Sequence, residues 1–343
     1  MTNRSLKWLT CAVLSVGITL TSWHSSAAVI FSDIYIFGDS LSDTGNTRAS
    51  VPLGSFGPVA ALAGYGPNGR FSNGILWHEY LSLELGLSSV RSTAGGNNFA
   101  YGGARIDNAT GPSTGVLSQY NQYLGRVGTS SFDADALYVA WAGGNDMRDL
   151  VGAANPLMIV SSVMGNFQIM LMDMIARGAS TLLVPNLPDL GSIPEFASGA
   201  QSASGSQVSM LWNAMLEEML IALAKQSQAD IYLLDVFTIF DDILANPSVE
   251  GFSDTTGECR SVTGGIFATE RTCANASQFV FWDEIHPTTA AHAVLGREAF
   301  QLLASGNTVY QEVSAPATLL LMLVGIFGIV RRRTFVQLVT RHH

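Results

Sequence analysis

Short apolar runs alternate with helical patterns through the middle of this chain, and this alternation restricts its possible folds more than any other feature. Four runs have the length and composition of buried strands: Ile34–Phe37, Ala136–Ala142, Thr181–Pro185 and Ile231–Val236. Helical apolar spacing marks the segments Leu157–Arg177 and Val208–Lys225. Apolar strands separated by helices indicate a parallel sheet with both faces covered. We therefore expect an α/β fold, a three-layer α/β/α sandwich around a central parallel sheet.

The composition suits one large domain and excludes one class of partner. The chain has 343 residues, of which 48% are hydrophobic, enough for a sizeable core. Only 13% are charged and the formal net charge is −10. We expect no binding to nucleic acid, because phosphate contacts need Lys and Arg. Between Val29 and Ser305 no internal repeat or charge block divides the sequence.

Residues 1–28 have the pattern of a secretory signal peptide. Arg4 and Lys7 precede the apolar run Leu9–Leu20, which is too short to cross a membrane by itself. The small residues Ser26-Ala27-Ala28 then provide a cleavage site. We expect an exported protein whose mature chain starts near Val29. An uncleaved membrane anchor is the alternative.

The C-terminal segment 309–343 leaves the globular pattern. The run Leu319–Val330 is almost wholly apolar and Arg331-Arg332-Arg333 follows at once, a stop-transfer arrangement with the arginines on the cytoplasmic side. This tail resembles the PEP-CTERM sorting tails of exported bacterial proteins, although their Pro-Glu-Pro core is reduced here to Ala315-Pro316. The resemblance implies a place in the cell envelope and cleavage by a sorting protease. An ordinary single-pass anchor, in lasting contact with the membrane, is the alternative.

Two cysteines remain once Cys11 leaves with the signal peptide. Cys259 and Cys273 are an even pair in an oxidising compartment, and we expect one disulfide that closes a short loop rich in Gly, Thr and Ser. Two separate thiols are the alternative. No stretch has the spacing of a zinc site, so no metal is expected.

The first informative cluster follows the first predicted strand. Parallel sheets bind ligands at the carboxyl ends of their strands, so residues placed there are candidates for chemistry. The cluster Gly38–Asn46 contains Ser40. A serine at such a junction can project its hydroxyl from the sheet edge while neighbouring backbone N–H groups face a developing oxyanion. The same residue types also favour turns and helix caps.

Two further clusters contain possible hydrogen-bond donors. Asn98–Ala104 holds the pair Gly102 and Gly103, which permits close approach of a backbone N–H to a ligand. Gly143–Asp146 follows the strand that ends at Ala142, and a side-chain amide held there, that of Asn145, can donate to an oxyanion. Each cluster taken alone is more often a structural turn or cap.

The fourth cluster, Phe281–Thr288, contains the expected base. Outside the two tails the chain has three histidines, His78, His286 and His292. A serine nucleophile needs an adjacent base at neutral pH. His286 has Asp283 three residues before it, a carboxylate able to orient the ring and stabilise the imidazolium. The other two histidines lie in helix-like stretches, where a structural or surface role is expected.

Together these four clusters resemble the GDSL lipase/esterase family, also called SGNH hydrolases, over nearly the whole of residues 29–308. Other stretches also match the family: Asn68–Gly74 with Trp77, Asn186–Gly191, and Asn246-Pro247 followed by Gly251-Phe252 and Cys259. The resemblance implies a flavodoxin-like sandwich. It also implies a role for each site residue: Ser40 as nucleophile, His286 as base, Asp283 to orient the base, and an oxyanion hole formed by Ser40, Gly103 and Asn145. Gly102 is the alternative to its neighbour in that hole.

The predicted activity is hydrolysis of a carboxylic ester through an acyl-enzyme, with no cofactor. The substrate can be a lipid, a short-chain ester or an acetylated glycan; the Phe281-Trp282-Asp283 block looks most like the lipase branch. Two alternatives stay open. One is an acyl transferase that passes the acyl group to an alcohol from the same intermediate. The other is a non-catalytic envelope protein that binds glycan, which would have no need for this set of Ser, Gly, Asn and His.

Deletion of everything after Tyr310 should leave ester hydrolysis unchanged, because every predicted catalytic cluster precedes that point. The measurement is kcat/KM of the truncated and full chains on one ester. A loss of activity in a truncated protein that is still folded would show that the catalytic domain extends into the tail.

Overall fold

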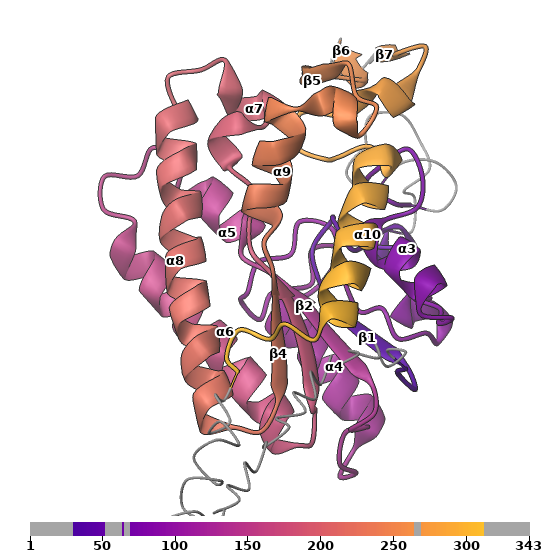
Figure 1. Ribbon diagram of the computed structural model, residues 1–343, viewed down its shortest axis with the longest axis vertical. Helices are drawn as coiled ribbons and strands as arrows, with labels where there is room; N and C mark the ends of the chain where they lie inside the picture. Colours follow the sequence, from indigo (N-terminus) through magenta and orange to yellow (C-terminus); the bar gives the residue numbers. More distant parts are fainter. Residues whose placement is uncertain (1–29, 52–63, 65–68, 264–268, 312–343) are drawn as a thin grey trace, which may run out of the picture.

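A computed structural model describes residues 30–51, 64, 69–263 and 269–311. The predicted signal peptide and the apolar tail lie outside these residues. The core is a sheet of four parallel strands in the order β1-β2-β3-β4 (Figure 1). Their bounds are Ile34–Gly38, Leu137–Trp141, Thr181–Pro185 and Asp230–Leu234. The α/β class and the parallel sheet expected from the sequence are therefore confirmed.

A short fifth segment extends the sheet beyond β1. Ile36 N donates to Asn97 O at 3.0 Å and Phe99 N donates to Ile36 O at 2.7 Å, with a parallel bridge between Ile36 and Asn98. This segment enters the sheet before β2 in the chain, so the order reverses at β1. That is the flavodoxin-like order, and its ligands bind where the order reverses, at the carboxyl ends of the two strands that flank that point. Here those strands are β1 and β2.

Long helices cover both faces of the sheet. On one face α3 (Trp77–Glu84) packs against α10 (Thr289–Ser305). On the other, α4 (Val116–Val127), α6 (Leu157–Ala176) and α8 (Ser202–Gln226) follow one another (Figure 1). Each connects two parallel strands and runs back across the sheet, as such crossovers require.

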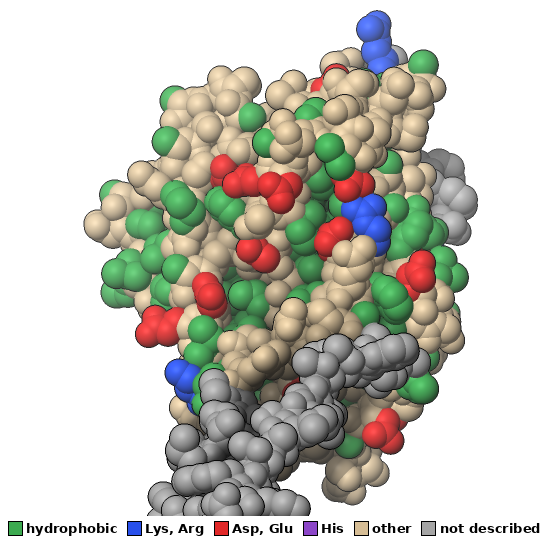
Figure 2. All heavy atoms as spheres, in the orientation of Figure 1, with side chains coloured by type: hydrophobic (Ala, Val, Ile, Leu, Met, Phe, Trp, Pro, Cys, Tyr) green, Lys and Arg blue, Asp and Glu red, His purple; other side chains and the backbone are tan. Residues whose placement is uncertain are grey.

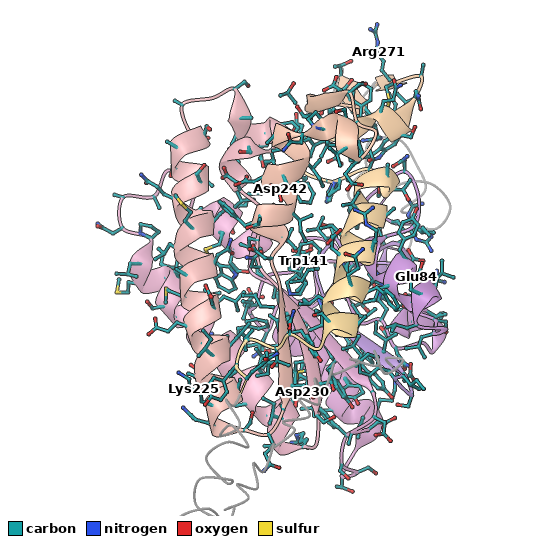
Figure 3. The ribbon with its side chains drawn as sticks, in the orientation of Figure 1. Glu84, Trp141, Lys225, Asp230, Asp242 and Arg271 are labelled. Carbon is teal, nitrogen blue, oxygen red and sulfur yellow. A yellow bond between two sulfur atoms is a disulfide. The ribbon has the colours of Figure 1, made fainter. Side chains whose placement is uncertain are left out.

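The alternation of side chains along the strands explains how the sheet packs against helices on both of its faces. Successive residues of a strand point to opposite faces. Phe37 of β1 packs edge-on against Tyr120 and Tyr123 of α4, at ring-centroid distances of 6.0 and 5.7 Å. Trp141 of β2, at the centre of Figure 3, packs edge-on against Trp77 of α3 at 5.4 Å. Both faces are therefore buried, which is why the strands are apolar throughout.

The remaining elements are short. The other α-helices are α1 (Asn46–Ser50), α5 (Gly144–Asp149), α7 (Pro194–Ala197) and α9 (Val236–Ala245). Single 3₁₀ turns lie at Ser92–Ala94, Leu190–Ser192, Pro247–Val249 and Ala276–Gln278. Strand β5 (Asp254–Glu258) pairs with β8 (Phe279–Phe281), and β6 (Arg260–Thr263) pairs with β7 (Thr269–Thr272).

Two predicted boundaries were wrong for local reasons. The fourth strand ends at Leu234 and not at Val236, because the Asp235 carboxylate caps α9 and accepts from Thr238 N at 3.2 Å. Helix α8 starts at Ser202 and not at Val208. Its first turns are Ser-, Ala- and Gly-rich and carry no apolar spacing, so the pattern alone could not find them.

The hairpin of β6 and β7 is closed by the expected disulfide between Cys259 and Cys273, whose Cα atoms lie 4.8 Å apart. It stands at the top of Figure 3, where Arg271 marks it. An ion pair from Arg260 Nε to Glu270 Oε1, 2.8 Å long, crosses the same hairpin. Closing a loop of 14 residues contributes about 3 kcal/mol in the chain-entropy model.

Helix α6 is the one helix in the described part of the chain that is long and apolar enough to cross a membrane, judged by length and composition. Its buried side chains, Phe167 and Leu171 among them, pack in the core, so it acts as a core helix here. Its outer face still exposes Met158 and Ile169. Figure 2 shows apolar side chains at this edge of the molecule, and red carboxylates clearly outnumber blue cationic groups on the face drawn.

The contact between α3 and α10 generates a stability prediction. A Cβ added to Gly296 of α10 would lie 2.5 Å from Tyr80 Cβ and 2.6 Å from Trp77 O. Gly296→Ala should therefore destabilise the protein by about 1–2 kcal/mol, the cost of overpacking reduced by the gain in helix propensity. Gly125→Ala in α4, where nothing lies within 4 Å, is the matched control and should raise stability by up to about 1 kcal/mol. Thermal unfolding of both variants is the measurement, and equal shifts would contradict the packing argument.

Candidate active site

Ser40 lies at the carboxyl end of β1, where the sheet order reverses. Its turn is fixed by Asp39, whose carboxylate accepts from Leu41 N at 3.0 Å and whose carbonyl accepts from Ser42 N at 3.1 Å. Ser40 itself is buried, with 8% of its surface exposed, but it lines a cavity that opens to solvent. The hydroxyl is thus held at the sheet edge and is reachable by a ligand.

The buried carboxylate of Asp43 joins this turn to the second sequence cluster. One oxygen accepts from Gly45 N and Asn46 N, both at 2.7 Å. The other accepts from Thr47 N at 3.1 Å and from Gly102 N at 2.9 Å. Burial raises the pKa of Asp43, and these N–H groups act against that rise. The Asp43 carboxylate therefore helps to fix the 102–103 loop relative to the serine turn, together with Thr47 Oγ1, which also accepts from Gly102 N at 2.7 Å.

His286 connects Ser40 to a second carboxylate. Its Nε2 lies 2.9 Å from Ser40 Oγ, and its Nδ1 lies 2.8 Å from Asp283 Oδ2. An ionised carboxylate can only accept, so Nδ1 carries the proton and Nε2 is left to accept from the serine hydroxyl. The three side chains form a hydrogen-bonded series in the order required for proton transfer away from Ser40.

The loop that carries His286 is rigid for local reasons. Asp283 Oδ1 accepts from Ile285 N at 2.9 Å and from His286 N at 2.7 Å. Trp282 N donates to His286 O at 2.7 Å, and an antiparallel bridge joins Phe281 to Pro287. The same carboxylate that contacts the imidazole therefore also folds the loop around it.

Phe71 supports the imidazole from its other side, which the sequence patterns did not indicate. Its ring centroid lies 5.3 Å from that of His286. Gly102 makes room for it, because a Cβ there would come within 2.3 Å of the Phe71 ring. Ser72 Oγ, next in the chain, donates to Pro287 O at 2.8 Å. The stretch that matched the family around these residues thus holds the histidine loop.

The possible oxyanion donors face the same cavity as Ser40. Gly103 and Asn145 both line it. The N–H of Gly102 is taken by Asp43 and by Thr47 Oγ1, at 2.9 and 2.7 Å, so it is not available. The N–H groups of Gly103 and Ser40 donate to no other described residue. This geometry favours Gly103 over its neighbour, the alternative left open by the sequence.

The side-chain amide of Asn145 is held at the start of α5. Its Nδ2 donates to Ala104 O at 3.0 Å and has a longer contact of 3.4 Å with Asp39 Oδ2. The amide nitrogen thus has one short partner and one longer contact, and Asn145 lines the cavity beside Ser40. Burial raises the pKa of Asp39 to about 6, although the N–H of Leu41 lowers it.

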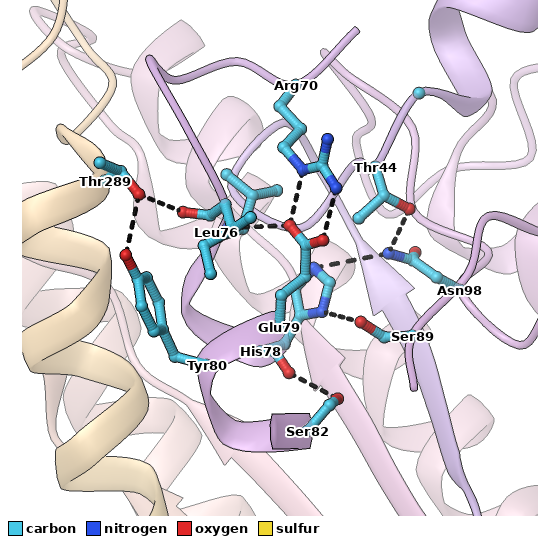
Figure 4. A network of polar contacts seen from close by, with 12 residues as sticks. Thr44, Arg70, Leu76, His78, Glu79, Tyr80, Ser82, Ser89, Asn98 and Thr289 are labelled. Atoms are coloured by element: carbon cyan, nitrogen blue, oxygen red, sulfur yellow. Dashed lines mark hydrogen bonds and ion pairs between the residues drawn. The ribbon is translucent and has the colours of Figure 1, made fainter. Parts of the chain in front are cut away.

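The other two histidines are buried. His78 lies in α3 and His292 lies in α10, the two helices that cover one face of the sheet. His78 Nδ1 lies 2.9 Å from Ser89 Oγ and its Nε2 lies 3.0 Å from Ser42 O, within the polar network of Figure 4. Burial lowers the pKa of His78 to about 4 and that of His292 to about 3. Both are neutral at physiological pH, in agreement with a structural role.

A second serine fits the letter pattern of another hydrolase motif. Gly111-Pro112-Ser113-Thr114-Gly115 has the spacing G-x-S-x-G. That motif acts at a sharp turn from a strand into a helix. Ser113 is exposed in a loop that follows no strand, and no described histidine bonds to it. Ser113 also lines the cavity around Ser40, but no described histidine lies within hydrogen-bond distance of it to act as its base.

A Ser–His–carboxylate series at the carboxyl edge of a flavodoxin-like sheet defines a class of serine hydrolase that differs from the α/β-hydrolases. Residues 34–299 match the model of the GDSL-like Lipase/Acylhydrolase family. The chain therefore belongs to that family, as the sequence motifs predicted.

Relatives at low identity cover most of the chain. It is 27% identical to a GDSL esterase/lipase of Arabidopsis thaliana, over 89% of this chain and 95% of that protein. It is also 27% identical to the phosphatidylcholine-sterol acyltransferase of Aeromonas hydrophila, over 87% of this chain and 97% of that protein. The solved structure of an acetylxylan esterase from Geobacillus stearothermophilus aligns with 83% of this chain and 100% of its own, at 14% identity and a TM-score of 0.41.

Asn145→Ala should lower kcat by roughly 10²–10³-fold with little change in KM, because one donor to the oxyanion would be lost from the transition state alone. Asn108→Ala, an exposed asparagine outside the cavity, is the control and should behave as wild type. Steady-state kinetics on a soluble ester is the measurement. A rise in KM at unchanged kcat would make Asn145 a residue that positions substrate.

Proposed function

We propose that this protein is a serine esterase that hydrolyses carboxylic esters through an acyl-enzyme on Ser40. The observation that carries the proposal is the hydrogen-bonded series from Ser40 to His286 to Asp283, at 2.9 and 2.8 Å. It opens into a cavity of about 570 Å³, on whose wall lie Gly103 and Asn145. The proposed nucleophile, base and two oxyanion donors thus line the same cavity.

The mechanism follows from this geometry. As Ser40 Oγ forms a bond to the ester carbonyl carbon, its proton passes to His286 Nε2. The carbonyl oxygen becomes an oxyanion that the N–H groups of Ser40, Gly103 and Asn145 hold. Collapse of this intermediate breaks the bond to the alcohol, which leaves with the proton from His286. Water then attacks the acyl-enzyme by the same steps and releases the acid.

Acyl transfer is a second candidate, favoured by one observation. A relative of similar coverage is a phosphatidylcholine-sterol acyltransferase. The same acyl-enzyme can pass its acyl group to an alcohol that enters the cavity in place of water. Assays with and without a primary alcohol, with ester and acid products counted separately, distinguish the two. The proposal of a non-catalytic glycan binder would require that no ester is turned over at all.

We further propose that the enzyme is exported and acts in the bacterial cell envelope or outside the cell. The signal-like residues 1–28, the Cys259–Cys273 disulfide and the apolar tail support this proposal. The tail would either be removed by a sorting protease or remain as a membrane anchor. Residues 29–308 would form the catalytic domain, although Val309 N still donates to Ile231 O in β4, one residue beyond this limit.

Ser40→Ala should leave the fold intact and reduce ester hydrolysis on the order of 10⁴-fold or more, the effect of removing a nucleophile that acts together with its base. An organophosphonate probe should label Ser40 in the wild type. Ser113→Ala, which removes another serine hydroxyl from the cavity wall, should keep the label. Activity retained in the Ser40 variant, with the label on another residue, would refute the assignment.

A further inference from the structure

Two cavities meet at Ser40, and they differ in size and in chemistry. The larger has a volume of about 570 Å³ and the smaller about 60 Å³. Charged side chains line the larger cavity, which we call the charged cleft: Arg148, Glu258, Arg260, Asp283 and Glu284. Apolar side chains dominate the wall of the smaller, which we call the apolar pocket: Leu41, Leu187, Pro188, Leu190, Ile193 and Ile285. The walls of both cavities include the shared residues Ser40, Asn145, Arg148, Ile285 and His286, and Asp39 also lines the apolar pocket.

We propose that the apolar pocket binds the acyl group and limits it to short chains, while the charged cleft takes a hydroxyl-rich alcohol. The proposal rests on the proposed ester hydrolysis and names the substrate class of the same site. It makes the protein an esterase for short-chain esters of polyols such as sugars, and not a lipase for long fatty acyl chains.

Desolvation decides which part of the ester enters which cavity. An alkyl chain in the charged cleft would remove the carboxylates of Glu258 and Glu284 from water without giving them partners, which is costly. Hydroxyl groups and water can instead bond to these side chains. In the apolar pocket an alkyl group gains the free energy of burying apolar surface, roughly 25 cal/mol per Å². A polar alcohol there would lose its hydrogen bonds to water.

The volume of the apolar pocket sets the length of the acyl group. The apolar pocket has about a tenth of the volume of the charged cleft, about 60 Å³ against about 570 Å³. It therefore has room for only a short acyl group beyond the carbonyl carbon, which would lie at Ser40. Longer chains fit only if the wall moves.

The first part of that wall is held by the core helix α8. Leu187 donates its N–H to Asn213 Oδ1 at 2.9 Å and accepts from Asn213 Nδ2 at 2.8 Å. Leu190 N donates to Ser209 Oγ at 3.1 Å. A Cβ on Gly191 would lie 2.2 Å from Ser202 O, so the two backbones already touch. The stretch Asn186–Gly191, which matched the family without a role in the chemistry, thus forms a fixed side of the pocket.

An ion pair holds the second part of the wall. Arg148 of α5 binds both carboxylate oxygens of Glu195 in α7, at 2.6 Å each. Glu195 N also donates to Glu284 O, in the loop that carries His286, at 3.0 Å. Ile193, the residue before α7, is therefore tied to the helix of Asn145 on one side and to the histidine loop on the other. This side of the pocket cannot retreat without moving the helix of Asn145 or the histidine loop.

The test is a series of p-nitrophenyl esters from acetate to decanoate with the full chain. We expect the highest kcat/KM at acetate or propionate and a fall of at least about 100-fold by octanoate, since a single misfitting methylene costs about 10–200-fold. A second series holds the acyl group as acetate, and an acetylated sugar should be turned over faster than a simple alkyl acetate. A maximum at octanoate or beyond would overturn the proposal.

Widening the apolar pocket should shift the acyl chain length at which kcat/KM is highest. Ile193→Ala should shift it by about two carbons, towards butyrate and hexanoate, with Ile193→Val as a milder version should the first variant fail to fold. Ile169→Ala, the same truncation at an exposed site on α6, should leave the order of esters unchanged. Unchanged order in both Ile193 variants would refute the assignment of the pocket.

The outcomes separate this proposal from the proposed function. Hydrolysis that persists in Ser40→Ala, or no turnover of any ester, would refute ester hydrolysis at this site. Hydrolysis that depends on Ser40 but prefers long acyl chains would leave the proposed function in place and refute the short-chain pocket alone.

Discussion

A single buried carboxylate, Asp43, sets the geometry on which the rest of the site depends. It accepts hydrogen bonds from the turn after β1 and from Gly102 in a distant loop. Because four N–H donors share it, movement of either loop would remove hydrogen bonds from a buried carboxylate, and such a loss is expensive. Its bond to Gly102 occupies that N–H and turns the next residue, Gly103, towards the cavity. The carboxylate thus acts through two loops on the distance between nucleophile and oxyanion donor.

The sheet and the four chemical clusters could be predicted from the sequence because each has a periodic or local signal. Strands buried on both faces are apolar throughout, and Thr181–Pro185 was placed to the residue. Asp283 and His286 are close in sequence and in space, so their pairing was visible in the chain itself. The choice between Gly102 and Gly103 was not visible, because it depends on which N–H the carboxylate of Asp43 takes.

Features built from distant residues left no such signal. Phe71 lies beside His286. The residues that follow them in the chain, Ser72 and Pro287, are hydrogen-bonded across a separation of 215 positions. The ion pair of Arg148 and Glu195 joins two short helices whose sequences carry no pattern of their own. One wall of the apolar pocket forms where the loop Asn186–Gly191 packs against α8. Such contacts depend on tertiary packing and not on local preference, so they become visible only in three dimensions.

The bond between Ser40 and His286 spans 246 positions of the chain. Contacts of such separation form late in folding, because a long loop must close before they return any free energy. The histidine loop leads directly into α10, the last helix described, which packs on α3. An incomplete chain, even one with β1 and the serine turn formed, therefore lacks its base. Activity that depends on both Ser40 and His286 would therefore begin only after the domain has been synthesised and folded as far as α10.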